Sequence, residues 1–134
     1  LWDDVEHLPQ VFTPDGQRHE PIPVKPDTEM FNFQRKLITL RKKRPDWTRG
    51  QLNYILANDN AMTLVYRRKL DKRETFVAFN LSGELQTIRL TTGNSTKKEI
   101  LVESSPGSVA GIRHERSATN LTISPYSGVA IGVE

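Results

Sequence analysis

Cysteine is absent from the 134 residues, which excludes disulfides, thiol catalysis and cysteine-ligated zinc. No apolar run approaches the ~20 residues of a membrane span. The three histidines, His7, His19 and His114, lie far apart and do not have the spacing of a histidine metal site. The sequence therefore predicts no metal, no cofactor and no membrane partner.

The chain carries a net charge of +3, and this charge is unevenly distributed. Residues 28–73 hold twelve basic and four acidic side chains, whereas residues 1–27 hold two basic and six acidic ones. A basic block of this kind is typical either of a surface for an acidic partner or of a solvated helix face next to a charged hairpin. We expect the second, and no nucleic-acid partner.

Hydrophobic residues make up 36% of the chain and charged residues 26%, as in a folded globular domain. The chain begins with Leu1 rather than methionine, and no secretion leader follows. We therefore expect a mature product or a cut fragment of a longer protein.

An extended arm and one helix are predicted for the first third of the chain. Residues 1–27 hold five of the eight prolines, which predicts an extended arm. Residues 28–44 have helical periodicity, with Asp27 or Thr28 as the N-cap and a stop at Pro45. Their apolar residues form two faces, and the wider one consists of Met30, Phe33, Leu37 and Leu40. Two apolar faces indicate a helix wedged between two bodies.

From residue 51 the hydrophobic period changes to two. The predicted strands cover 52–56, 62–66, 74–81, 85–90, 98–102, 121–123 and 129–133, whereas residues 104–119 have no period and are predicted to be a mobile loop. Short strands separated by Gly, Asn, Ser and Pro are typical of a sandwich. The predicted fold is mainly β: an antiparallel β-sandwich of about seven strands, preceded by the proline-rich arm and one amphipathic α-helix.

No complete catalytic constellation is present in the sequence. Asp3 and Asp4 are paired carboxylates, but they lie on the terminal arm rather than in a walled cleft. Five aromatic residues could stack on sugar rings: Trp2, Trp47, Tyr54, Tyr66 and Tyr126. Most of them follow apolar periodicity, so we expect them to pack in the core or an interface. Tyr66 in particular is expected to face the interior with Met62 and Leu64.

Several segments, in order, resemble the alpha-amylase family (glycoside hydrolase family 13), especially its neopullulanase and cyclomaltodextrinase-like subgroup. Leu1–Asp4 is similar to the Trp-Asp segment after the last barrel strand, and residues 31–41 are similar to the final barrel helix. Residues 64–68, 76–82 and 121–129 are similar to strands of the C-terminal β-domain. The family's catalytic carboxylates lie upstream of this Trp-Asp segment, so none maps onto this chain.

The resemblance implies that residues 1–48 are the end of a catalytic barrel and that 49–134 are a C-terminal β-sandwich domain. The partner would be the barrel of the same polypeptide, and the parent enzyme would hydrolyse O-glycosyl bonds in starch-derived oligosaccharides. One helix face would meet the barrel and the other the β-domain. Trp2, Asp3 and Asp4 would lie near the barrel mouth as weak candidates for substrate binding. The barrel-facing interface would consist of Met30, Phe33, Leu37, Leu40 and Arg41.

Two predictions concern the helix if the barrel is not present. Arg41 projects from within the apolar arc, so we expect it to be partly buried and bonded to a carboxylate or to carbonyls. The face around Leu37 would have lost its partner, so we expect self-association through it.

Two other function classes stay open. The first is a stand-alone carbohydrate-binding module that stacks glucose rings on exposed aromatics. The second is a basic interaction domain that uses residues 35–73 to bind an acidic partner. Under each of these interpretations the chain itself is not an enzyme.

Overall fold

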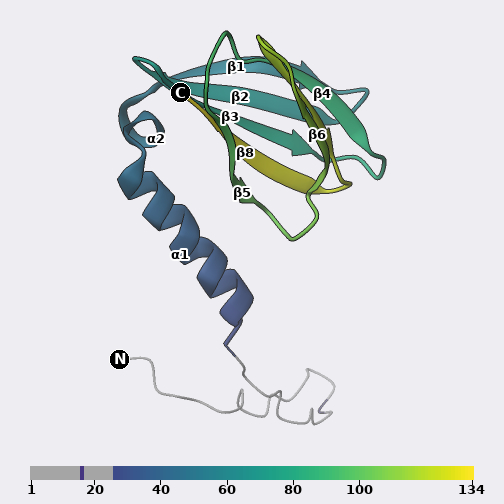
Figure 1. Cartoon of the computed structure of the whole chain (residues 1–134). Coiled ribbons are helices and arrows are strands. Elements are labelled where there is room, and N and C mark those ends of the chain that lie inside the picture. Colours follow the sequence, from purple (N-terminus) through teal and green to yellow (C-terminus); the bar gives the residue numbers. More distant parts are fainter. Residues whose placement is uncertain (1–15, 17–25) are drawn as a thin grey trace. The chain divides into compact units, whose positions relative to one another are not determined.

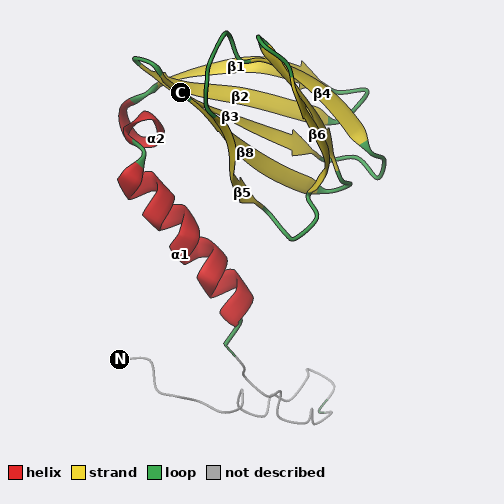
Figure 2. Cartoon of the chain, in the orientation of Figure 1, coloured by secondary structure: helices red, strands yellow, loops and turns green. Residues whose placement is uncertain are grey.

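The structure is a computed structural model, and it describes residue 16 and residues 26–134. The predicted arm, with Trp2, Asp3 and Asp4, lies outside the described residues. Two helices are followed by eight strands (Figures 1 and 2). They are α1 (Thr28–Lys43), α2 (Pro45–Arg49), β1 (Gln51–Asn58), β2 (Thr63–Leu70), β3 (Arg73–Asn80), β4 (Gln86–Thr91), β5 (Lys98–Glu103), β6 (Val109–His114), β7 (Ala118–Ile123) and β8 (Ser127–Val133).

Helix α1 has the predicted extent. The Asp27 side chain accepts a hydrogen bond from the Met30 amide at 2.9 Å, so Asp27 is the residue that caps the helix. Arg41, Lys42 and Lys43 occupy its last turn, where cations interact favourably with the helix dipole. None of the described helices is long and apolar enough to cross a membrane.

The strands form two antiparallel sheets, which confirms the predicted sandwich. The larger sheet has the order β1-β2-β3-β8-β5, and the smaller one has the order β4-β7-β6. All of the predicted strands are present, but the stretch 104–119 is not simply a loop, because it contains β6 and the start of β7. Strand β6 is one of the two outer strands of the small sheet and is mostly exposed, so its sequence has no apolar alternation.

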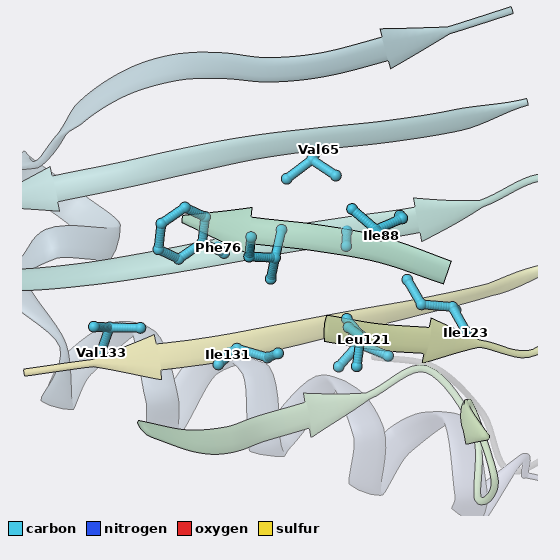
Figure 3. Packing of buried hydrophobic residues seen from close by; sticks show 10 residues of the cluster. Val65, Phe76, Ile88, Leu121, Ile123, Ile131 and Val133 are labelled. Atoms are coloured by element: carbon cyan, nitrogen blue, oxygen red, sulfur yellow. The ribbon is translucent and has the colours of Figure 1, made fainter. Parts of the chain in front are cut away.

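The core lies between the two sheets (Figure 3). Its buried side chains come from β2, β3 and β8 of the larger sheet and from β4 and β7 of the smaller one; they are Val65, Phe76, Ala78, Val129, Ile131, Val133, Ile88, Leu90, Leu121 and Ile123. Ile88 and Leu90 of β4 are both buried. Burying large apolar side chains at about 1.5–3 kcal/mol each is the main stabilisation of such a sandwich.

Strand β8 is buried along its whole length. Val129, Ile131 and Val133 belong to the core, and small residues alternate with them. At Gly128 an added Cβ would lie 2.9 Å from the Phe79 ring, and at Gly132 it would lie 3.0 Å from the Arg44 guanidinium. These glycines therefore let larger side chains cross the outer face of β8.

The side chains of β2 that face the core are offset by one residue from the prediction. Val65 has no exposed surface and lies in the core, whereas Tyr66 is half-buried and pairs with Val77 and not with a core residue. The Tyr66 ring lies 6.3 Å from the ring of Phe79. Burial raises the pKa of the Tyr66 phenol above its ordinary value. Since successive side chains alternate between faces, Tyr66 belongs to the outer face of the sheet.

Candidate functional site

The most developed polar cluster joins α2 to the larger sheet. We call it the α2 junction, and it consists of Arg44, Asp46, Trp47, Arg68, Glu74 and Thr75. Asp46 and Thr75 have no exposed surface, and Arg44 is 6% exposed. Charged side chains are rarely buried to this degree unless they are paired. The junction is therefore the part of the described chain where polar residues have been placed most specifically.

The Thr75 hydroxyl links α2 to strand β3. It accepts a hydrogen bond from the Trp47 indole at 2.9 Å and donates one to the Asp46 carboxylate at 2.5 Å. An indole only donates and a carboxylate only accepts, so the direction of both bonds is fixed. The arrangement holds the Trp47 ring and the Asp46 side chain in one orientation on the sheet.

The Arg44 guanidinium fills the space beside Asp46. It donates to the Asp46 carboxylate and to the Glu74 carbonyl, each at 3.3 Å. Its other terminal nitrogen lies 3.5 Å from the Glu134 carboxylate, which also pairs with Arg73 at 3.1 Å. A buried guanidinium needs several acceptors, and the planar fork of arginine can reach all of these.

Arg68 fixes the end of α2. Its side chain donates to the Asp46 carbonyl at 3.2 Å and to the Gly50 carbonyl at 2.9 Å. Gly50 itself lies so close to α2 that an added Cβ would stand 2.4 Å from the Asp46 carbonyl. The short helix is thus bonded to β2 and β3 through both side chains and backbone.

The sequence did not single out Arg44 or Asp46. Arg44 ends the run Arg41–Arg44, which looks like the solvated last turn of a helix. It precedes Pro45, and its backbone is extended, with φ −113° and ψ 101°. This change of direction turns Arg44 away from the helix periodicity and into the junction. In the sequence, the one sign of this change of direction is the Pro45-Asp46 pair after the basic run.

The predicted barrel-facing residues are placed on α1, where no residue is buried. Met30 is 52% exposed, and Phe33, Leu37 and Leu40 are half-buried. The second apolar face is open too, with Phe31 at 64% and Ile38 at 56% exposure. The expectation that this second face packs on the β-domain stays a prediction.

The predicted burial and pairing of Arg41 are not found within the described chain. Arg41 is exposed, and among the described residues it makes no hydrogen bond or ion pair. The buried arginine of this segment is Arg44, three residues further on. The predicted pairing of Arg41 therefore needs an acceptor outside the described residues.

Two of the aromatic side chains expected to be packed are instead exposed. Tyr54 is 71% exposed on β1, and Tyr126 is 76% exposed in the turn before β8. Tyr126 has a left-handed backbone, with φ +50°, and its amide donates to the Ser82 carbonyl at 3.2 Å. Its hydroxyl lies against Gly83. Trp47 is half-buried in the α2 junction, as expected of packing.

A second polar cluster surrounds Glu115, at the end of β6. The Glu115 carboxylate pairs with Arg89 at 2.9 Å and accepts a hydrogen bond from Asn120 at 2.8 Å. The hydrogen bond from Arg89 is the main cause that lowers the pKa of Glu115. Lys98 nearby donates to the Glu115 and Ala118 carbonyls. These groups satisfy one another, which is typical of a structural cluster.

Replacing Arg89 with glutamine is expected to raise the pKa of Glu115 toward its ordinary value of about 4.5. Because the folded-state pKa is lowered, the ion pair stabilises the fold above pH 4.5, and this contribution is lost as the pH falls through the lowered value. Carboxyl NMR titration measures the pKa directly. Arg116→Gln removes a nearby charge without breaking the pair, and it should leave the titration nearly unchanged.

No group of three or more potential metal ligands occurs among the residues that the structure describes. The described junction and the Glu115 cluster use their carboxylates in ion pairs and hydrogen bonds. What the α2 junction can do is hold one helix turn to the larger sheet.

Comparison with solved structures gives the fold a context. The chain is similar to an alpha-amylase from H. orenii, with a TM-score of 0.60 and 23% identity over 78% of this chain and 20% of that chain. It is similar to an isomaltulose synthase from Erwinia rhapontici NX5, with a TM-score of 0.62 and 21% identity over 78% of this chain and 18% of that chain. It is also similar to a debranching enzyme from Nostoc punctiforme, with a TM-score of 0.63 and 20% identity over 84% of this chain and 26% of that chain.

No family model matches the chain, and no curated protein matches it. The chain spans about a fifth to a quarter of the length of these three enzymes. The predicted resemblance to alpha-amylase-family enzymes is thus confirmed at the level of the fold: the chain folds like one part of such enzymes.

Proposed function

We propose that the chain is the C-terminal portion of an alpha-amylase-family enzyme that acts on α-glucosidic bonds in starch-derived oligosaccharides. The carrying observation is the unequal coverage, because 78–84% of this chain matches only 18–26% of each enzyme. In this proposal residues 1–48 complete the catalytic barrel and residues 49–134 form the β-domain. The chain itself is not an enzyme, since the catalytic carboxylates belong to the remainder of the barrel.

The proposed role of the chain is to pack against the barrel. Exposed apolar side chains on both faces of α1 support this role, since each large side chain left in water forfeits about 1.5–3 kcal/mol. The barrel-facing side would carry Met30, Phe33, Leu37 and Leu40, and Arg41 would find its carboxylate on the barrel. The α2 junction would transmit the orientation of the helix to the sandwich.

The test begins with the coding sequence upstream of Leu1. An in-frame barrel that carries paired catalytic carboxylates would support the proposal, and an unrelated upstream domain would contradict it. The longer protein should hydrolyse maltoheptaose. Leu37→Glu should lower its thermal stability more than Lys36→Glu, a neighbouring change at an already polar and exposed position. Equal effects of the two changes would contradict the packing role.

The isolated chain is expected to release no reducing sugar from cyclodextrin, pullulan or maltoheptaose. Retaining glycosidases need two carboxyl groups about 5–5.5 Å apart across the scissile bond, and the sequence offers no such pair in a cleft. Preparations from an amylase-deficient host serve as the control. Hydrolysis that persists in such preparations would contradict the assignment of catalysis to the upstream barrel.

A carbohydrate-binding module is the second candidate, and the exposed rings of Tyr54 and Tyr126 favour it. We expect weak or absent binding, with amide NMR shifts nearly unchanged by millimolar maltoheptaose. A saturable shift around either tyrosine, abolished by its replacement with alanine, would instead support the module.

A basic interaction domain is less well supported. Many of its side chains are engaged within the fold: Arg44, Arg67, Arg68, Lys69 and Arg73 all make ion pairs or hydrogen bonds to acidic side chains or backbone carbonyls. The charges left for a polyanion are therefore fewer than the sequence suggests.

A further inference from the structure

The four edge strands of the described sheets are not equally protected. Edges expose unpaired backbone groups, and natural proteins place charged residues there to prevent pairing with another chain. Strands β5, β4 and β6 each carry charge, at Lys98, Glu99, Glu103, Arg89 and Arg113. Strand β1 reads QLNYILAN and has no charged residue and no proline. It is therefore the edge that is open to strand pairing.

The side chains of β1 fit this interpretation. Leu52, Tyr54 and Ile55 are 45%, 71% and 44% exposed. Branched and aromatic residues of this kind pair favourably across neighbouring strands. One bulge interrupts the register between Tyr54 and Leu56, but the segment Gln51–Tyr54 pairs regularly with β2. The outer side of this segment offers both backbone groups and apolar side chains to a further strand.

The charges that flank β1 are opposite in sign. Arg49 precedes the strand and Asp59 follows it, and both are exposed. If two copies of β1 lie antiparallel, the Arg49 end of each copy meets the Asp59 end of the other. A parallel arrangement would instead bring Arg49 beside Arg49. The strand is thus complementary to itself in the antiparallel orientation, which is also the orientation that a two-fold axis generates.

We propose that β1 is a homotypic interface, through which a second copy of this chain adds its own β1 to the larger sheet. The sheet then continues across both copies. In a register centred on Asn53, Leu52 of each copy lies opposite Tyr54 of the other on one face of the sheet. The proposal concerns a strand edge rather than the α1 face, and it does not depend on the function proposed above.

Sedimentation equilibrium over a concentration series of the whole chain tests the proposal. The unchanged chain should dimerise, and the double variant Leu52→Lys, Tyr54→Lys should weaken the dimer at least about tenfold, because it places like charges opposite one another. Ile100→Lys is the matched control. Ile100 lies on the opposite edge strand with 41% exposure, and its replacement should leave the dimer unchanged.

A charge exchange gives a second readout that does not touch the strand. Arg49→Asp and Asp59→Arg should each weaken the dimer, and the two together should restore it, because the antiparallel pairing is then re-formed with the signs exchanged. Amide hydrogen exchange adds a third measurement. The edge-facing amides of β1 should become more protected as the concentration rises, whereas those of β5 should not.

Three outcomes would overturn the proposal. The first is a strictly monomeric chain at all concentrations. The second is a dimer that resists the β1 variants but is weakened by Leu37→Glu, which would assign the association to the α1 face. The third is equal weakening by the β1 variants and by Ile100→Lys, which would indicate unspecific association. Circular dichroism of each variant shows whether it keeps the fold.

Discussion

Replacing Asp46 with alanine is expected to lower the free energy of unfolding by about 3–5 kcal/mol, the usual cost of removing one partner of a buried ion pair. The Arg44 guanidinium, only 6% exposed, would lose the buried Asp46 carboxylate and keep only the partly exposed one of Glu134 at 3.5 Å. The Thr75 hydroxyl would lose its acceptor at the same time. A loss of this size is a large fraction of the 5–15 kcal/mol that typically stabilises a domain.

Urea unfolding followed by circular dichroism measures this effect. Asp59→Ala is the matched control, because Asp59 is exposed, and it should change stability by less than about 0.5 kcal/mol. The variant Asp46→Asn keeps an acceptor for Thr75 but loses the charge. We expect its loss of stability to lie between those of Asp46→Ala and Asp59→Ala. A double variant, Arg44→Met with Asp46→Ala, should recover part of the loss because no buried charge is left unpaired. Similar stability for Asp46→Ala and Asp59→Ala would show that the junction contributes nothing.

The α2 junction also shows why sequence patterns located the sandwich but missed its main polar cluster. Hydrophobic period reports where strands lie, so β3, β4 and β8 could be predicted. The junction has no period: Arg44, Asp46 and Thr75 come together only because a helix turn folds back onto a sheet. Contacts between residues about thirty positions apart leave no local pattern.

Local patterns failed in two other places, for different reasons. The sequence predicts a loop where β6 lies, since its exposed side chains and Gly111 carry no alternation. It predicts Tyr66 inside because Tyr66 is in register with Met62 and Leu64, but Thr63 and Val65 are the buried residues. The outer face of β2 packs partly against Phe79, so both faces of the strand are apolar and the period cannot distinguish them.

The candidate interface on α1 is predicted from two apolar faces, and no residue of α1 is buried in the described chain. The inference from the sequence was that large side chains on a helix need a partner. The structure adds that the sandwich forms its core without them, because every buried member of that core belongs to a strand. A core built from strand residues leads to a second prediction about stability.

Replacing Phe76 with alanine is expected to cost about 3–5 kcal/mol, the usual range for a buried phenylalanine. Phe76 is 1% exposed, and it lies on the central strand β3 between the two sheets. Removing the ring leaves a cavity that Val65, Ile131 and the small sheet can fill only in part. Phe31→Ala removes the same ring from α1, where Phe31 is 64% exposed, and it should cost less than about 1 kcal/mol in this chain.

Comparing the stability costs of these two substitutions shows whether the sandwich and α1 contribute separately to the stability of the chain. Thermal and urea unfolding should show a large loss for Phe76→Ala and a small one for Phe31→Ala. In the longer protein proposed above, the cost of Phe31→Ala should rise if the barrel covers that face, while the cost of Phe76→Ala should stay the same. If Phe31→Ala instead destabilised the present chain as much as Phe76→Ala, α1 would belong to the core of the sandwich. The exposed helix would then have no need of a barrel.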